Sequence, residues 1–408
     1  MILEEQGVKF NTNNMTLSGA RLHLGKSDLT LSGELSDIRR AMLRGGKLKA
    51  NFELESDLID CNQLMLAIGK GLQFSDQLAS NSVGAFSEDS ISVLETDHLL
   101  ANTVDSVATD SISQLFVVPK FLDLTLHTNA KKIDFKDLKL EDVKGEVVIR
   151  DQSINLSDLC MSSNIGSGDL TMVYTTKTDQ EATMGFELSL DDILVERLIS
   201  LFPDIDTLVP MLRSFEGMVD CQMTATCKAD STMSVLLPSV NASCYLSGKN
   251  MVLLDGETFT EISKTLMFKN KKRNMIDSIA VDLAIHDNKI EVFPFLVEMD
   301  RYKVAVGGTH NLDMTFDYHL SVLKSPVPFK LGIDIKGNLD DFKFKIVKCK
   351  YKDFLKPAKQ AELDSTRRNV REEIRETIRK QIREAAPELG NSLSEIHPHT
   401  HGHVEEST

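Results

Sequence analysis

Apolar and polar residues alternate with a period of two along most of the chain. Successive side chains of a β-strand point to opposite faces, so each alternating run predicts a strand with one apolar face and one polar face. The apolar residues of these runs, each run of one parity, are Leu29, Leu31 and Leu35; Leu48, Ala50, Phe52 and Leu54; Met184, Phe186, Leu188 and Leu190; Val219, Cys221, Met223 and Ala225; Ile279, Val281, Leu283 and Ile285; Met314, Phe316, Tyr318, Leu320 and Val322; Leu331, Ile333 and Ile335; and Phe342, Phe344 and Ile346.

Short polar turns, such as Asp151-Gln152 and Gly337-Asn338, separate these runs. We therefore predict a mainly β protein, formed by an elongated, curved antiparallel sheet of repeated strands. The sheet would form a groove and carry a few short helices. Strands of this kind need a cover for their apolar face, so either the sheet folds on itself or something else fills it.

Two helices are predicted within the β-rich region. Residues 60–71 are rich in Leu and Met, and residues 191–215 carry Leu194, Leu198 and Leu201 at helical spacing. A strand with the sequence Phe-Glu-Leu precedes each of them, at residues 52–54 and 186–188. This degenerate repeat indicates stacked units in place of separate globular domains.

A third helix is predicted near the C-terminus. Its apolar stripe recurs every four residues, at Val370, Ile374, Ile378 and Ile382, among many charged residues. A narrow stripe of this kind can pack on the sheet or on a partner, and its basic residues could also favour anionic lipid headgroups.

The chain divides into five predicted parts. They are an N-terminal β segment at 1–74, an acidic Ser-rich linker or loop at 75–115, a second β region at 116–356, a charged helix at 357–390, and a disordered His-containing tail at 391–408. The linker contains no Lys or Arg, which is typical of a solvated loop. Pro and Gly interrupt the histidines of the tail, so we predict no metal site there.

The net charge of −15 argues against nucleic acid as a partner, because phosphate binding needs clustered Lys and Arg. Trp is absent, which removes a common platform for base stacking. The six cysteines form no CxxC pair, and we predict mostly reduced core residues. A disulfide among Cys221, Cys227 and Cys244 stays open, since the first two share one face of a strand.

No catalytic motif is recognisable in the sequence. The chain contains no GxSxG, HExxH or Walker loop, and its carboxylates form no evident dyad. We expect the scattered histidines to be surface or rim residues; they are His23, His98, His127, His286, His310 and His319. The sequence thus predicts no enzyme, no catalytic residue, no cofactor and no metal.

Several strand-Gly-strand segments resemble the recurrent units of AsmA-like proteins of the bacterial envelope, with Bacteroides-type members the most similar. The segments are residues 29–35, 143–149, 246–256 and 335–339, and the resemblance covers roughly residues 15–70 and 116–356. It implies a periplasmic protein that takes part in phospholipid transport between inner and outer membrane and in outer-membrane assembly. It also implies an inner-membrane anchor formed by an N-terminal helix, which is absent from this chain.

Phospholipid acyl chains and envelope proteins or membranes are therefore the expected partners. A curled sheet with an apolar face would shield acyl chains from water, at about 0.8 kcal/mol per methylene. The candidate lining residues are Leu29, Leu31, Phe52, Leu54, Phe186, Leu188, Val281, Leu283, Phe316 and Leu320.

Two other readings stay open. The same residues could pack a closed core, in which case the protein would be a structural or interaction scaffold of the periplasm. An undetected hydrolase would instead show a pocket with clustered carboxylates or histidines.

Overall fold

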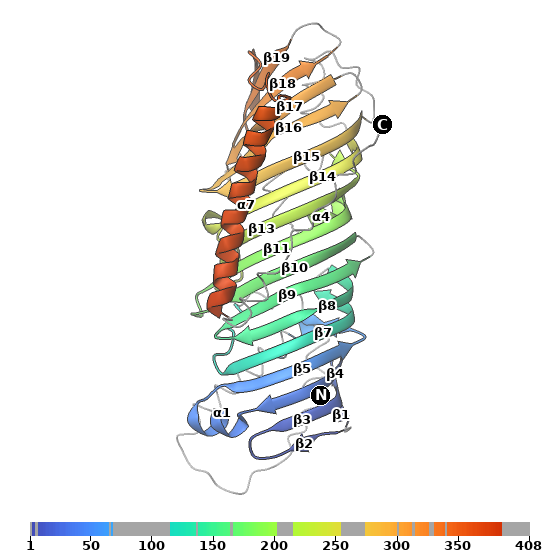
Figure 1. The fold of residues 1–408 in the computed structure, drawn as a ribbon, viewed down its shortest axis with the longest axis vertical. Helices are drawn as coiled ribbons and strands as arrows, with labels where there is room; N and C mark the ends of the chain where they lie inside the picture. Colours follow the sequence, from blue (N-terminus) through green and yellow to red (C-terminus); the bar gives the residue numbers. More distant parts are fainter. Residues whose placement is uncertain are drawn as a thin grey trace.

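In the computed structural model, strand follows strand along the long axis of the molecule and forms one continuous sheet (Figure 1). The structure describes residues 2–4, 7–64, 67, 115–135, 138–163, 166–201, 215–253, 274–299, 302–311, 315–325, 330–338 and 341–385. The predicted linker at 75–114 and the tail at 391–408 lie outside the described residues. The mainly β fold is confirmed.

The elements follow one another in three groups. The first comprises β1 (Ile2–Glu4), β2 (Lys9–Phe10), β3 (Met15–Leu24), β4 (Ser27–Ser36), α1 (Ile38–Arg44), β5 (Leu48–Ser56) and β6 (Ile59–Asp60). The second comprises β7 (Leu122–Phe135), β8 (Leu138–Arg150), β9 (Ser153–Ser163), β10 (Gly166–Thr175), β11 (Glu181–Leu194) and α4 (Val195–Leu201). The third comprises β12 (Phe215–Glu216), β13 (Met218–Asp230), η3 (Leu237–Ser239), β14 (Asn241–Leu253), β15 (Asn274–His286), β16 (Lys289–Met299), β17 (Tyr302–Asn311), β18 (Phe316–Lys324), β19 (Leu331–Gly337), β20 (Phe342–Val347) and α7 (Pro357–Ala385).

Almost every strand pairs with its neighbour in the sequence. From β3 to β5 and from β7 to β20 the pairing is antiparallel, while the short strands β6 and β12 pair beside β7 and β14. The short strands β1 and β2 both pair with β3 at one end of the sheet. Among the described strands, β20 forms the other end, because it pairs only with β19.

Among the described strands, the predicted antiparallel pairing is interrupted where β5 and the short β6 both pair with β7 in parallel. Strand β5 pairs with β7 in parallel, from Leu48 beside Leu122 to Ser56 beside Ala130. Antiparallel neighbours can be joined by a tight turn, but parallel neighbours need a longer crossover. The chain between β6 and β7 is long enough to return to the same end of the sheet, so the sheet is mixed.

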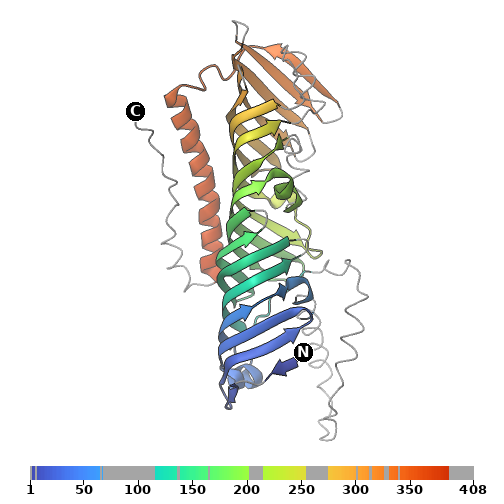
Figure 2. The same ribbon diagram turned by 90° about the vertical axis from the view of Figure 1, so that its right-hand side faces the viewer.

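The two main helices lie on opposite sides of the sheet. Figure 2 shows the long α7 on one side and the short green α4 on the other. Helix α7 packs Ile374 and Ile378 on Val173, and Gly185 lets it approach closely, since a Cβ there would lie 3.2 Å from Ile378 Cγ1. This confirms an amphipathic C-terminal helix that docks on the sheet. The side chain of Ile382 lies outside the described residues.

The boundaries of the two internal helices differ from those expected. Helix begins at residues 61–64 as predicted, and most of the remainder of 65–71 lies outside the described residues. The helix predicted at 191–215 is wrong in its first turn, because Ile193 and Leu194 still pair with β13. Helix α4 therefore begins only at Val195, and residues 202–214 lie outside the described part.

All six cysteines are free thiols. Cys221, Cys227 and Cys244 are buried, and the half-buried Cys61 and Cys349 pack against smaller core clusters. The prediction of core positions is wrong only for Cys160, which is exposed. A hydrogen bond with Cys221, together with burial, raises the pKa of the Cys244 thiol well above its usual value. The two thiols in contact are therefore Cys221 of β13 and Cys244 of β14. The pair Cys221 and Cys227, which the sequence places on one face of β13, is not the pair in contact.

Candidate functional site

A continuous apolar face is the most extended feature of the sheet. Side chains of paired residues point to the same face, so the register traces one row of side chains across the strands. One such row, from β4 to β20, comprises Gly33, Phe52, Leu126, Val147, Leu156, Met172, Phe186, Ala225, Ala242, Ile285, Ile290, His310, Phe316, Gly337 and Phe342. We call the side of the sheet that carries this row the apolar face, and the opposite side the polar face.

All ten residues predicted to line a groove lie on the apolar face. Phe52, Phe186 and Phe316 belong to the traced row, and the others share their parity on the same strands or join them through paired neighbours. Leu54 pairs with Leu31, and Leu283 pairs with both Cys244 and Val292. The register therefore brings together residues that are as far apart in sequence as 29 and 320.

The ten residues differ in how far they are covered. Phe52, Leu54, Leu188 and Leu283 are buried, with 5–9% of their surface exposed. The other six are half-buried; they are Leu29, Leu31, Phe186, Val281, Phe316 and Leu320.

Only short elements cover the apolar face within the described residues. Helix α4 packs Val195 and Leu198 into a cluster with residues of β11 and β13–β16. Residues 115–118 cover Tyr174 and Ala182, and the helical turn at 61–64 lies against Leu54. The middle of the face is thus a packed core. Ile333 and Ile335 of β19 are buried as well, whereas Phe344 and Ile346 of β20 are exposed.

The environment of this face disfavours charge. Burial raises the pKa of Tyr318 to about 12, and burial raises the pKa of Tyr174 likewise to about 12 despite its hydrogen bond to the Phe116 carbonyl. Side chains of this kind can exclude water and hold aliphatic chains.

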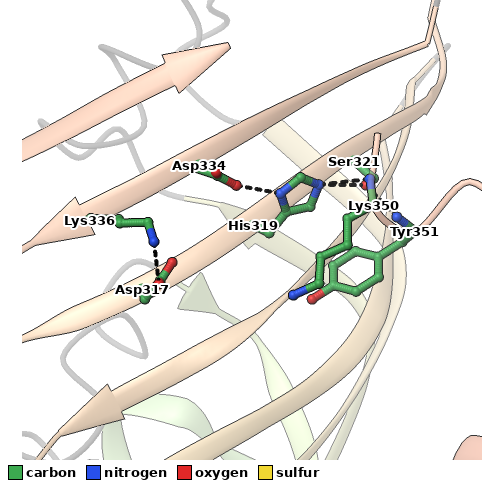
Figure 3. Close-up of polar contacts among 7 residues, drawn as sticks. All are labelled: Asp317, His319, Ser321, Asp334, Lys336, Lys350 and Tyr351. Carbon is green, nitrogen blue, oxygen red and sulfur yellow. Dashed lines mark hydrogen bonds and ion pairs between the residues drawn. The ribbon is translucent and has the colours of Figure 1, made fainter. Parts of the chain in front are cut away.

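A polar cluster on the opposite face was not predicted from the sequence. His319 Nδ1 lies 2.5 Å from Asp334 Oδ1, and His319 Nε2 lies 3.0 Å from Ser321 Oγ (Figure 3). The prediction that His319 is a surface or rim residue is wrong, because its exposed fraction is 6%; His310 is likewise buried, at 4%. The available signal was the pair His319 and Ser321 at polar positions of one alternating run.

The arrangement has the residue types of a catalytic triad but not its access. Ser321 is fully buried, and its Oγ accepts the Tyr351 backbone N–H at 2.9 Å. The Lys350 backbone N–H donates to His319 Nε2 at 3.1 Å, so the neutral ring carries its proton on Nδ1, toward Asp334. A nucleophile must reach its substrate. This cluster instead fastens the chain after β20 to the polar face.

A shallow depression of about 570 Å³ opens at this cluster, and its lining includes Asp317, His319 and Asp334, the residue types expected of the hydrolase alternative. Ser321 is not among its lining residues. Lys336 and Asp317 pair with each other at 2.6 Å. The described residues contain no group of three or more His, Cys, Asp or Glu placed to hold a metal ion. Within the same residues, no helix is long and apolar enough to cross a membrane.

Comparisons with protein-family models, curated proteins and solved structures found no match.

Proposed function

We propose that this chain is a non-enzymatic protein that holds phospholipid acyl chains on its apolar face. The observation that carries the proposal is the position of α7. In a protein whose amphipathic sheet forms a closed core, the longest helix is expected to cover the apolar face of the sheet. Here α7, the longest described helix, lies on the polar face, and the apolar face runs through the strands from β4 to β20.

The energetics favour such an occupant. Removing apolar surface from water stabilises by roughly 25 cal/mol per Å², or about 0.8 kcal/mol per methylene. Half-buried residues such as Phe186, Val281 and Leu320 still offer surface for this. The headgroup of a bound phospholipid would stay in water at the margin of the sheet.

The setting follows from the AsmA-like resemblance. We propose a periplasmic protein that moves phospholipid between the inner and outer membrane and supports outer-membrane assembly, attached to the inner membrane by an N-terminal helix. The row of mostly apolar residues that runs from β4 to β20 supports this proposal, because a lipid crossing between membranes needs shielding along its path.

Native mass spectrometry of the purified chain, with quantification of extracted phospholipid, tests the lipid proposal. The wild type should retain phospholipid. Val281→Glu places a charge on the apolar face of β15, and Ser278→Glu places the same charge at an exposed polar-face position of that strand. We expect several-fold less lipid with Val281→Glu and unchanged lipid with Ser278→Glu. A wild type that carries no lipid and excludes fluorescent acyl probes would overturn the proposal.

The packed cluster around α4 favours a second candidate, the scaffold. Leu198 has no exposed surface, and Ile276, Ile290 and Ile193 are each exposed by 1% or less. In a scaffold this packing would extend over the whole face, and acyl probes would find no room. The same lipid measurement therefore separates the two functions.

A further inference from the structure

The end of the sheet at β20 carries a charge opposite to that of the whole chain. Residues 341–359, which we call the basic tip, contain seven lysines against two aspartates, a local net charge of +5 in a chain of −15. Its lysines, all exposed, are Lys343, Lys345, Lys348, Lys350, Lys352, Lys356 and Lys359.

Exposed apolar side chains accompany these lysines. On β20, Phe344 is 42% exposed and Ile346 is 63% exposed, and both lie on the apolar face because they pair with Ile335 and Ile333. Leu355, after the strand, is 48% exposed. The apolar face thus ends at β20, which carries Phe344 and Ile346 on that face and Lys343 and Lys345 on the polar face.

The basic tip is held in place. The His319 cluster accepts the backbone N–H groups of Lys350 and Tyr351 (Figure 3), and Phe354 is buried against Ala305 and Leu323. Because its backbone is fastened, the tip presents its lysines from a fixed position at the end of the sheet.

We propose that the basic tip docks onto the surface of an anionic lipid bilayer. Lysine ammonium groups are attracted to anionic headgroups, and neighbouring Phe and Ile side chains enter the interface. Docking there would place the end of the apolar face at the bilayer, where an acyl chain can leave or enter. The purpose of this contact rests on the proposed lipid-binding function.

The spread of charge favours a membrane over an acidic protein strand. A strand added to the free edge of β20 would meet only the lysines of that strand, Lys343 and Lys345. Lys348, Lys352 and Lys356 lie beyond it. A broad anionic surface that meets the end of the sheet edge-on can contact lysines of the strand and lysines beyond it.

Vesicle flotation tests the inference. Full-length chain is mixed with vesicles of phosphatidylcholine alone or with about 30% phosphatidylglycerol, at low and high salt. We expect binding only to the anionic vesicles, weakening as salt rises. With about fivefold per lysine near the surface, the variant K343Q/K345Q/K348Q/K352Q should lose at least about a hundredfold in partitioning.

Two further variants sharpen the test. K132Q/K139Q/K144Q/K177Q removes the same charge from exposed positions far from the tip and should retain most of the binding. F344S/I346S should weaken binding several-fold at every salt concentration, because the variant loses apolar contact with the bilayer and salt does not screen that contact.

Three results would overturn the inference. The first is no binding to either kind of vesicle, and the second is an equal loss of binding in both lysine variants. The third is that the chain captures an acidic polypeptide, and that F344S/I346S changes neither this capture nor the binding to vesicles. Phospholipid extracted from the same preparations keeps the two proposals apart. A chain that carries lipid but ignores vesicles refutes only the docking. A chain that binds vesicles but carries no lipid refutes only the proposed function.

Discussion

The two faces of the sheet are covered in different ways. On the apolar face, cover comes from short elements, and the packed core is concentrated around α4. On the polar face, α7 crosses several strands with a short apolar stripe and a set of arginines. The difference shows that α7, the longest described helix, packs against the polar face through ion pairs with its arginines. It does not cover the apolar face.

The arginines of α7 show how that match is made. Arg375 pairs with Glu187, while Arg367 and Arg371 both reach Asp282, at 3.2 and 3.3 Å. Arg371 also lies over the Tyr245 ring, 5.8 Å from its centre. Burial raises the pKa of Asp282 although the two arginines oppose this shift. Desolvation thus offsets much of the attraction, and we infer that the pairs fix the position of α7 more than they stabilise it.

The largest expected effect separates packed from open parts of the apolar face. Leu198→Ala should lower the free energy of unfolding by about 2–5 kcal/mol, because a fully buried side chain leaves a cavity. Leu320→Ala, at a half-buried position, should cost about 1–2 kcal/mol. Urea unfolding followed by circular dichroism measures both. Equal costs would mean that the face is one closed core, as in the scaffold.

The next effect tests whether α7 is independent of the apolar face. Ile378 is 3% exposed against Val173, so Ile378→Ala should lower the opening free energy of α7 by about 2 kcal/mol. Amide hydrogen exchange in α7 should then be about thirtyfold faster, with lipid content unchanged. Thr377→Ala, at an exposed neighbouring position, is the control. Loss of lipid with Ile378→Ala would contradict the separation of the two faces.

A smaller effect is expected at the buried hydroxyl of the polar cluster. Ser321→Ala removes the acceptor of the Tyr351 N–H and should cost about 1 kcal/mol. Hydrogen exchange at residues 350–354 should rise while global unfolding changes little. If Ser321→Ala instead abolished a measurable esterase activity, the cluster would be catalytic and the non-enzymatic proposal would fail.

The smallest effect concerns alkaline pH. The folded-state pKa of Tyr318 is about 12, against 10 for an ordinary tyrosine, so its contribution is full below pH 10 and is lost as pH rises toward 12. Near pH 10.5, Tyr318→Phe should gain about 0.8 kcal/mol relative to the wild type, compared with their difference at pH 7. Unfolding midpoints across this range report it. A constant difference would mean that Tyr318 is open to water.

The local pattern of the sequence determined the strands and the face that each apolar residue occupies. Phe52, Phe186 and Phe316 could be assigned to one face because alternation is a property of neighbouring residues. These three residues fall into one row of the sheet if each strand pairs with the next strand along the chain. The charged helix was also predictable, since its stripe repeats every four residues.

Only the tertiary structure decided the contacts between distant segments. The parallel entry of β7 beside β5 depends on where a long excursion returns. The choice of the polar face by α7 depends on Asp282 meeting Arg371, 89 residues away. His319 is buried because Tyr351 folds back over it. Local periodicity specifies which way a side chain points, but pairing across the fold decides what covers it.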